Sequence, residues 1–259
     1  MLTQNLIQDT STTNRVGNFS DLSFLRAFQM ELTHRLRKGS VEQGASGIGR
    51  SASSDPSISE QNAMSAAQLL IAEPKKAIAF TRPKGSQRVI PFIQHFMHAM
   101  QTFKDKRVLF IDAHVSSRGF TSMTRQNEFG LGWLDLISGS APVWRVIQRL
   151  ESSNIFFVER GRKSKNPLQD YYAENIRHFF DLLFSLFDYL IIDTPALDNL
   201  KGYDALIKTC DAMALVTEDS FPDAPCRKQI ESQINQFGIE FWGTYVSAPI
   251  MNSTMDGMK

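Results

Sequence analysis

Cysteine, long apolar runs and excess charge are all scarce in this chain. Its 259 residues include two cysteines, Cys210 and Cys226, in no CxxC or metal-ligand spacing, which argues against a disulfide scaffold and fits a reducing compartment. No stretch approaches the ~20 apolar residues that span a bilayer. The formal net charge of +1 argues against a broad nucleic-acid-binding surface, and the first residues lack the layout of a signal peptide. We therefore expect a cytoplasmic protein that does not bind nucleic acid.

Hydrophobic residues make up 42% of the chain, enough for a sizeable core, and they follow an alternating pattern from residue 60 onward. Short apolar runs typical of buried strands are separated by stretches of helical periodicity. This alternation predicts an α/β fold with a doubly wound, mainly parallel sheet. The expected strands lie at 77–80, 107–112, 155–158, 189–193, 212–216 and 241–246, and the expected helices at 60–71, 89–103, 130–139, 143–150, 168–187, 200–209 and 224–237.

The two ends of the chain differ from this central domain at 60–247. Residues 1–59 form an expected N-terminal extension, with a helix at 21–38 and a Gly/Ser-rich flexible linker at 39–59. The helix would carry a broad apolar face, which either docks on a partner or folds back on the main domain. Residues 248–259 are expected to be a disordered tail. The apolar face of the expected helix consists of Leu22, Phe24, Leu25, Phe28, Leu32 and Leu36.

The stretch from Lys76 to His114 has the order strand, Gly-containing loop, helix, strand. P-loop NTPases begin with a unit of this kind, and their loop ends in G-K-[ST] so that backbone N–H groups and a lysine hold phosphates while a hydroxyl binds Mg²⁺. The loop here, from Arg82 to Val89, lacks that ending. The scaffold of a nucleotide site is therefore predicted without its usual phosphate-binding groups.

Several segments, taken together and in order, resemble the cytoplasmic domain of bacterial tyrosine kinases, which are P-loop proteins related to the MinD/ParA ATPases. The resemblance covers roughly residues 60–247 and is most specific at 187–195, where FDYLIIDTP is similar to the family's Walker B strand. The other matching segments are KRVLFIDA at 106–113, similar to the Walker A′ strand, GLGWLDLISG at 130–139, Asn166-Pro167, and DAMALV at 211–216.

The resemblance implies a nucleotide site whose remnants here are Gly85, Ser86, Gln87, Arg88 and Val89 in the loop, with Asp112, Asp193 and Thr194 at the ends of two strands. Gln87 replaces a glycine, Arg88 the lysine and Val89 the metal-binding hydroxyl. Asp112 and Asp193 would be metal ligands only if Mg²⁺ binds. We expect no cofactor, or only weak binding of ATP and Mg²⁺.

Three further features of the family are missing. The residues after Val246 contain no tyrosine, whereas the family's kinases carry acceptor tyrosines in their C-terminal tail. Glu60, Ala63 and Ala66 stand where the family has an E-x-x-R-x-x-R ring-assembly pattern, so the oligomeric state stays open. His114 also replaces an aspartate that the family usually has.

These departures predict a catalytically degenerate, kinase-like protein of capsule or exopolysaccharide biosynthesis. By resemblance, its partner would be an inner-membrane polysaccharide co-polymerase or a related envelope protein, which would place the chain at the inner face of the plasma membrane. The alternatives are an active autokinase or ATPase with an atypical loop, and a MinD/ParA-like positioning protein. The basic residues Arg160, Arg162, Lys163 and Lys165 are either a solvated loop or a contact for the partner or anionic lipid.

Overall fold

A computed structural model describes residues 57–84, 86, 89–114, 130–150, 153–161, 173–218 and 222–247. The expected helix at 21–38, the linker that follows it and the tail at 248–259 lie outside these residues. Within the described residues, no helix combines the length and apolar character needed to cross a bilayer.

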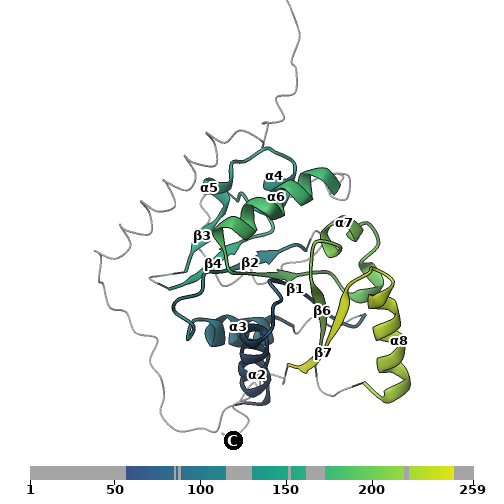
Figure 1. The fold of residues 1–259 in the computed structure, drawn as a ribbon. Helices are drawn as coiled ribbons and strands as arrows, with labels where there is room; N and C mark the ends of the chain where they lie inside the picture. Colours follow the sequence, from purple (N-terminus) through teal and green to yellow (C-terminus); the bar gives the residue numbers. More distant parts are fainter. Residues whose placement is uncertain are drawn as a thin grey trace, which may run out of the picture.

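The described residues form a seven-stranded, mostly parallel sheet in the order β3-β4-β2-β5-β1-β6-β7 (Figure 1). All six strands expected from the sequence are present, which confirms the predicted α/β class. The strand that the sequence analysis missed, β3, pairs antiparallel with β4 at one edge. The strands are β1 (Ala77–Thr81), β2 (Val108–Asp112), β3 (Gln148–Arg149), β4 (Ile155–Val158), β5 (Tyr189–Asp193), β6 (Ala212–Thr217) and β7 (Glu240–Val246).

Helices cover both faces of the sheet, so it is doubly wound as predicted (Figure 1). α2 and α3 pack on one face, while α4 to α8 contribute to the core on the other. The helices are α2 (Ile58–Ala72), α3 (Val89–Met100), α4 (Trp133–Ile137), α5 (Val143–Val146), α6 (Ala173–Leu186), α7 (Asp204–Ile207) and α8 (Ala224–Asn235), with a 3-10 turn η3 (Leu197–Asn199).

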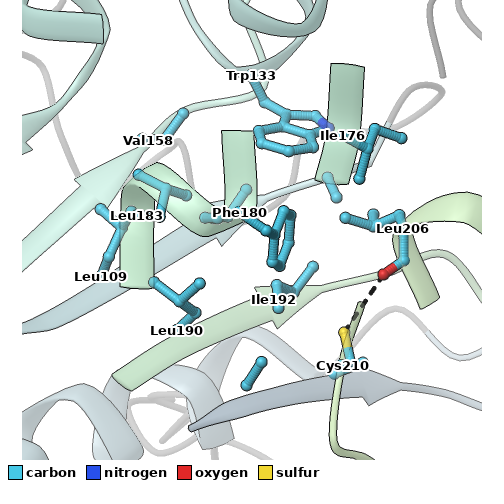
Figure 2. Packing of buried hydrophobic residues seen from close by; sticks show 14 of the residues in the cluster. Leu109, Trp133, Val158, Ile176, Phe180, Leu183, Leu190, Ile192, Leu206 and Cys210 are labelled. Atoms are coloured by element: carbon cyan, nitrogen blue, oxygen red, sulfur yellow. Dashed lines mark hydrogen bonds between the residues drawn. The ribbon is translucent and has the colours of Figure 1, made fainter. Parts of the chain in front are cut away.

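Each face of the sheet has its own hydrophobic core, because successive strand residues point to opposite sides. On the α2/α3 face, the ring of Phe80 meets the rings of Phe92 and Phe96 edge-on at 5.4 and 5.2 Å. On the other face, Trp133 lies 5.6 Å from Phe179 between ring centroids, and Figure 2 shows it beside Phe180 and Ile176 of α6. The abundant phenylalanine is thus largely core.

Three local predictions need correction. α2 begins at Ile58 rather than at residue 60, and Ser57 caps it, because the Ser57 hydroxyl accepts from the Glu60 N–H at 3.2 Å and the Glu60 carboxylate accepts from the Ser57 N–H at 2.7 Å. The expected helix at 143–150 ends at Val146, and its last part forms β3 instead. The helix expected at 200–209 is only the single turn α7, preceded by η3.

The carboxyl ends of β1, β2 and β5 lie side by side in the centre of the sheet. The chain passes from β1 across to β2, and returns later to place β5 between them. Asp112 is the register partner of Asp193, and Phe80 is the partner of Asp193 on the other side. In open α/β sheets ligands bind at such carboxyl ends, where the strand order reverses.

Candidate functional site

Strand alternation places three charged side chains on the same face of the sheet. The core beneath α2 and α3 takes two residues from each of β1, β2 and β5: Ile78 and Phe80, Val108 and Phe110, and Tyr189 and Ile191. Continuing each strand by two residues brings Arg82, Asp112 and Asp193 to this same face. The three side chains are buried, with relative exposures of 5%, 0% and 2%.

Arg82 occupies the centre of this group. Its Nη2 atom donates to Asp193 Oδ1 at 2.6 Å, forming a buried ion pair. The same nitrogen lies 2.6 Å from His114 Nε2 and 3.3 Å from the carbonyl oxygen of Thr194. One guanidinium therefore links the carboxyl ends of β1, β2 and β5, and its charge faces the acidic residue of the Walker B-like strand.

Asp193 sits in an environment that disfavours its ionised form. Burial raises its pKa to about 7, and the nearby Asp112 adds to the shift, while the charge of Arg82 opposes it. Asp112 Oδ1 accepts the N–H of His114 at 3.1 Å, which fixes the turn after β2. The two aspartates are thus adjacent and in register, and a cation from the chain itself pairs with one of them.

His114 is neutral in this arrangement. Burial lowers its pKa to about 3, and the positive charges of Arg82 and Arg160 push in the same direction. Because the arginine can only donate, Nε2 of the neutral ring is the acceptor of their 2.6 Å contact. Arg160, expected in a basic loop, therefore contributes to the electrostatics of this site.

Hydroxyl groups and backbone bonds hold the surrounding loops. The Thr194 hydroxyl donates to the Phe80 carbonyl at 2.9 Å, and the Thr81 hydroxyl donates to the Pro195 carbonyl at 2.7 Å. The Thr194 N–H also donates to Phe80 at 2.9 Å. Thr194 is therefore engaged in joining β5 to β1.

Ser86 donates its hydroxyl to Glu218 at 3.0 Å, so it too has a protein partner. The described residues do not include the other loop remnants, which are Gly85, Gln87, Arg88 and the side chain of Val89. The same holds for Arg162, Lys163 and Lys165. Their predicted roles stay predictions.

Arg82 is the site residue that sequence reasoning missed. Two signals could have identified it: an arginine directly after a buried strand, and its position two residues beyond the inward-facing Phe80. The loop substitutions drew attention to Arg88 instead, because that residue aligns with the family's lysine.

The residues present do not fit a Mg²⁺ ion. A metal on Asp193 would have to displace or closely approach the Arg82 guanidinium, since both would compete for the same carboxylate. Two buried atoms of the pair, Asp193 Oδ2 and Arg82 Nε, have no hydrogen-bond partner among the described residues. Asp193 Oδ2 is an acceptor and could bind a cation, whereas Arg82 Nε is a donor and could not. No group of three or more His, Cys, Asp or Glu within the described ranges has the arrangement of a metal site.

The comparisons with known proteins agree with the fold. No family model matches the chain. It is 26% identical over 141 residues to a protein named tyrosine-protein kinase CpsD from Streptococcus pneumoniae, covering 54% of this chain and 62% of that protein. It is 24% identical over 140 residues to the protein of the same name from Streptococcus agalactiae, covering 53% and 60%. The match thus spans about three fifths of these relatives' length.

Solved structures extend the comparison over most of the chain. The kinase domain of VpsO aligns with a TM-score of 0.63 and 15% identity, covering 74% of this chain and 94% of that domain. The kinase domain of the Escherichia coli tyrosine kinase ETK gives 0.59 and 16%, covering 83% and 88%. MinD from Pyrococcus horikoshii, solved with Mg-ADP, gives 0.53 and 16%, covering 65% and 68%. The chain is therefore a sequence relative of proteins named tyrosine-protein kinase CpsD, and it has the fold shared by bacterial tyrosine-kinase domains and the MinD and ParA ATPases.

Proposed function

We propose that this protein is a catalytically degenerate, tyrosine-kinase-like regulator of capsule or exopolysaccharide synthesis, which binds an inner-membrane polysaccharide co-polymerase and does not use ATP. The observation that carries the proposal is the buried ion pair of Arg82 with Asp193. It engages the acidic residue of the Walker B-like strand with a cation from the chain.

The loop sequence supports the same conclusion. Arg88 and Val89 replace the lysine and the hydroxyl of the family's loop. Each lost charge-assisted contact is worth ~1.5–3 kcal/mol. Losing both would weaken a micromolar nucleotide affinity to about millimolar or worse, since every 1.4 kcal/mol is roughly tenfold.

The alternative is an active kinase or ATPase with an atypical loop. It is favoured by one observation: Asp112 and Asp193 remain register partners at the carboxyl ends of β2 and β5. Under this alternative, nucleotide binding would have to move Arg82 away from Asp193.

Isothermal titration of the full chain with ATP and Mg²⁺ separates the two. We expect ATP to bind no more tightly than about millimolar, because the two charge-assisted contacts of the loop are lost. A low-micromolar affinity that is lost in Asp193→Ala would overturn the proposal. Lys228→Met, which removes an exposed cation on α8 outside that loop, is the matched control and should leave either result unchanged.

Complementation tests the biological role separately. The double variant Arg82→Met/Asp193→Asn removes the pair without leaving a buried charge. If the protein acts by binding a partner, this variant restores polysaccharide amount and chain length in a host that lacks the gene. If the protein acts as a kinase or ATPase, the variant does not restore them although it is folded and present.

A further inference from the structure

A groove lies between α6 and α7, two of the helices that cover the sheet face opposite α2 and α3. Its volume is about 320 Å³, which falls within the range of ligand pockets. The two helices contact each other, and Phe180 of α6 and Leu206 of α7 belong to one core cluster (Figure 2). The groove therefore sits directly on the folded core. Below, it is called the α6/α7 groove.

One side of α6 forms the first wall. Arg177, Phe180, Asp181 and Phe184 line the groove, and their spacing of three and four residues places them on the same face of the helix. Phe180 is buried and Phe184 half-buried, and their rings meet edge-on with centroids 5.9 Å apart. Arg177 and Asp181 are exposed. This wall thus has an aromatic base with charged groups above it.

The second wall is made by α7 and the two residues that follow it. Ala205, Lys208 and Thr209 line the groove, again three and four residues apart. Ala205 and Thr209 are small, so the space opposite the two phenylalanines stays open. The Thr209 hydroxyl donates to the Leu206 carbonyl at 2.6 Å and is engaged within its own turn. Lys208 is exposed and adds a cation to the rim.

The rim of the groove carries two cations and one anion. No side-chain hydrogen bond or ion pair within the described part of the chain involves Arg177, Asp181 or Lys208. By contrast, Lys75 and Lys106 each pair with a neighbouring carboxylate. The rim therefore has an excess of one positive charge, which favours a ligand with carboxylates.

We infer that the α6/α7 groove binds an acidic peptide segment of the protein's partner. An apolar side chain of that segment enters between Phe184 and Ala205, and the carboxylates beside it pair with Arg177 and Lys208. In interfaces of this kind the inserted apolar side chain supplies much of the affinity, while charges at the rim set the rate and the specificity of binding. The inference rests on the proposed function, because that function requires a partner.

The composition of the groove favours a peptide over other occupants. A nucleic acid or an anionic membrane binds to several clustered cations, whereas this rim places Asp181 beside its two cations. An uncharged apolar ligand would leave Arg177 and Lys208 without partners. A peptide meets all three requirements, since it offers an apolar side chain to the aromatic base, carboxylates to the cations and backbone N–H groups to Asp181.

Titration of the isotope-labelled full chain with the tripeptide N-acetyl-Glu-Phe-Glu-amide, followed by amide NMR, tests the inference. We expect the amide signals of α6 and α7 to shift, with a dissociation constant on the order of millimolar for so short a probe. The analogue with glutamine in place of both glutamates should bind about threefold more weakly or worse, because it loses both exposed ion pairs. The analogue with alanine in place of phenylalanine should bind more weakly still, because it lacks the apolar side chain.

Matched variants separate the groove from the general charge of the protein. Arg177→Glu/Lys208→Glu should weaken binding of the tripeptide by about tenfold. Arg227→Glu/Lys228→Glu makes the same change of charge at exposed positions of α8 and should leave binding unchanged. Ala205→Leu, which fills the groove with a larger side chain, should abolish binding, and it replaces the glutamate pair as the test if that pair fails to fold by circular dichroism.

Complementation connects the groove to the partner. In a host that lacks the gene, the groove variant Arg177→Glu/Lys208→Glu should fail to restore polysaccharide chain length although it is folded and present, whereas the α8 variant Arg227→Glu/Lys228→Glu should restore it. Full restoration by the groove variant would overturn the inference.

Three results of the titration would also overturn it. The first is the absence of shifts on α6 and α7, and the second is equal binding of the glutamine analogue, which would reveal an unspecific apolar crevice. The third is a change of the groove signals with protein concentration together with the mass of a dimer in light scattering, since a second copy would then occupy the groove. Tight binding of ATP would instead overturn the proposed function, and it leaves the tripeptide titration unaffected.

Discussion

Replacing Arg82 by methionine should change how the stability of the protein depends on pH. The buried carboxyl of Asp193 has a pKa of about 7 in the folded protein, well above its unfolded value near 4. Between these values the folded state holds a proton that the unfolded state has lost, so stability falls with rising pH by about 1.4 kcal/mol per pH unit. Above pH 7 the fall levels off, because the folded carboxylate ionises beside Arg82.

Without Arg82 this levelling is lost, because the arginine is the group that lowers the pKa of Asp193. The carboxyl of Arg82→Met then stays protonated beyond pH 7, and stability continues to fall. The gap in unfolding free energy between the native protein and Arg82→Met should therefore widen by about 1–2 kcal/mol between pH 6 and pH 8. This comes on top of a constant loss from the missing hydrogen bonds to His114 and Thr194.

Urea unfolding followed by tryptophan fluorescence measures this gap, using the chain's three tryptophans. Arg82→Met/Asp193→Asn should show no widening, because neither partner can ionise. Lys84→Met should differ from the native protein by less than about 0.5 kcal/mol at every pH, as for an exposed ion pair. A gap for Arg82→Met that stays constant from pH 6 to pH 8 would refute the pairing of Arg82 with Asp193.

Three further substitutions test other parts of the structure. His114→Asn should reduce the loss of stability on acidification from pH 7.5 to 5.5 by about 1–2 kcal/mol in urea unfolding. The reason is that the buried ring, with its pKa lowered to about 3, stays neutral while the unfolded ring gains a proton below about pH 6.5. An identical dependence of the unfolding free energy on pH in the two proteins would contradict this. Gly161→Ala should lower the melting temperature far more than Gly139→Ala, because a Cβ on Gly161 would lie within 2.8 Å of the Gly132 backbone whereas one on Gly139 meets nothing within 4 Å. Asn154→Asp should destabilise more than Asn154→Ala (about 1–3 kcal/mol), since the side-chain amide donates to three carbonyls that a carboxylate would repel; equal losses at pH 7 would show that these bonds contribute little.

The fold was largely predictable because the buried strands carry a strong local signal. Runs such as 189–193 are apolar until their final aspartate, because helices cover both faces of the sheet and every strand residue is buried. Such a continuous apolar run can be recognised from its own sequence alone. The errors occurred where the local signal is weak. Residues 148–149 form a two-residue edge strand that depends on β4, and α7 is a single turn too short to show a helical period.

The candidate site was predictable in position but not in content. The acidic strand ends, Asp112 and Asp193, were recognised from sequence because they end apolar runs. Arg82, the partner of Asp193, lies 111 residues before it along the chain, and only the pairing of β1 with β5 brings the two together. Interpretation of the loop alone emphasised Arg88, which lies outside the described residues. The order of the strands in the sheet decides which charged residues become neighbours, and no local sequence pattern encodes that order.

The ion pair also bears on why such a domain persists if its nucleotide site is lost. Adjacent buried carboxylates repel each other and favour protonation, which costs stability at neutral pH. In a nucleotide-binding relative a bound metal could offset that repulsion, but only while the ligand is present. Here the guanidinium of Arg82 does so permanently, because arginine stays charged across the physiological range. The strand ends are then held together without any ligand, and under the proposed function the surface that the domain presents would not depend on nucleotide. A protein that acts by binding a partner gains from such constancy, whereas a nucleotide-driven switch would be blocked by it.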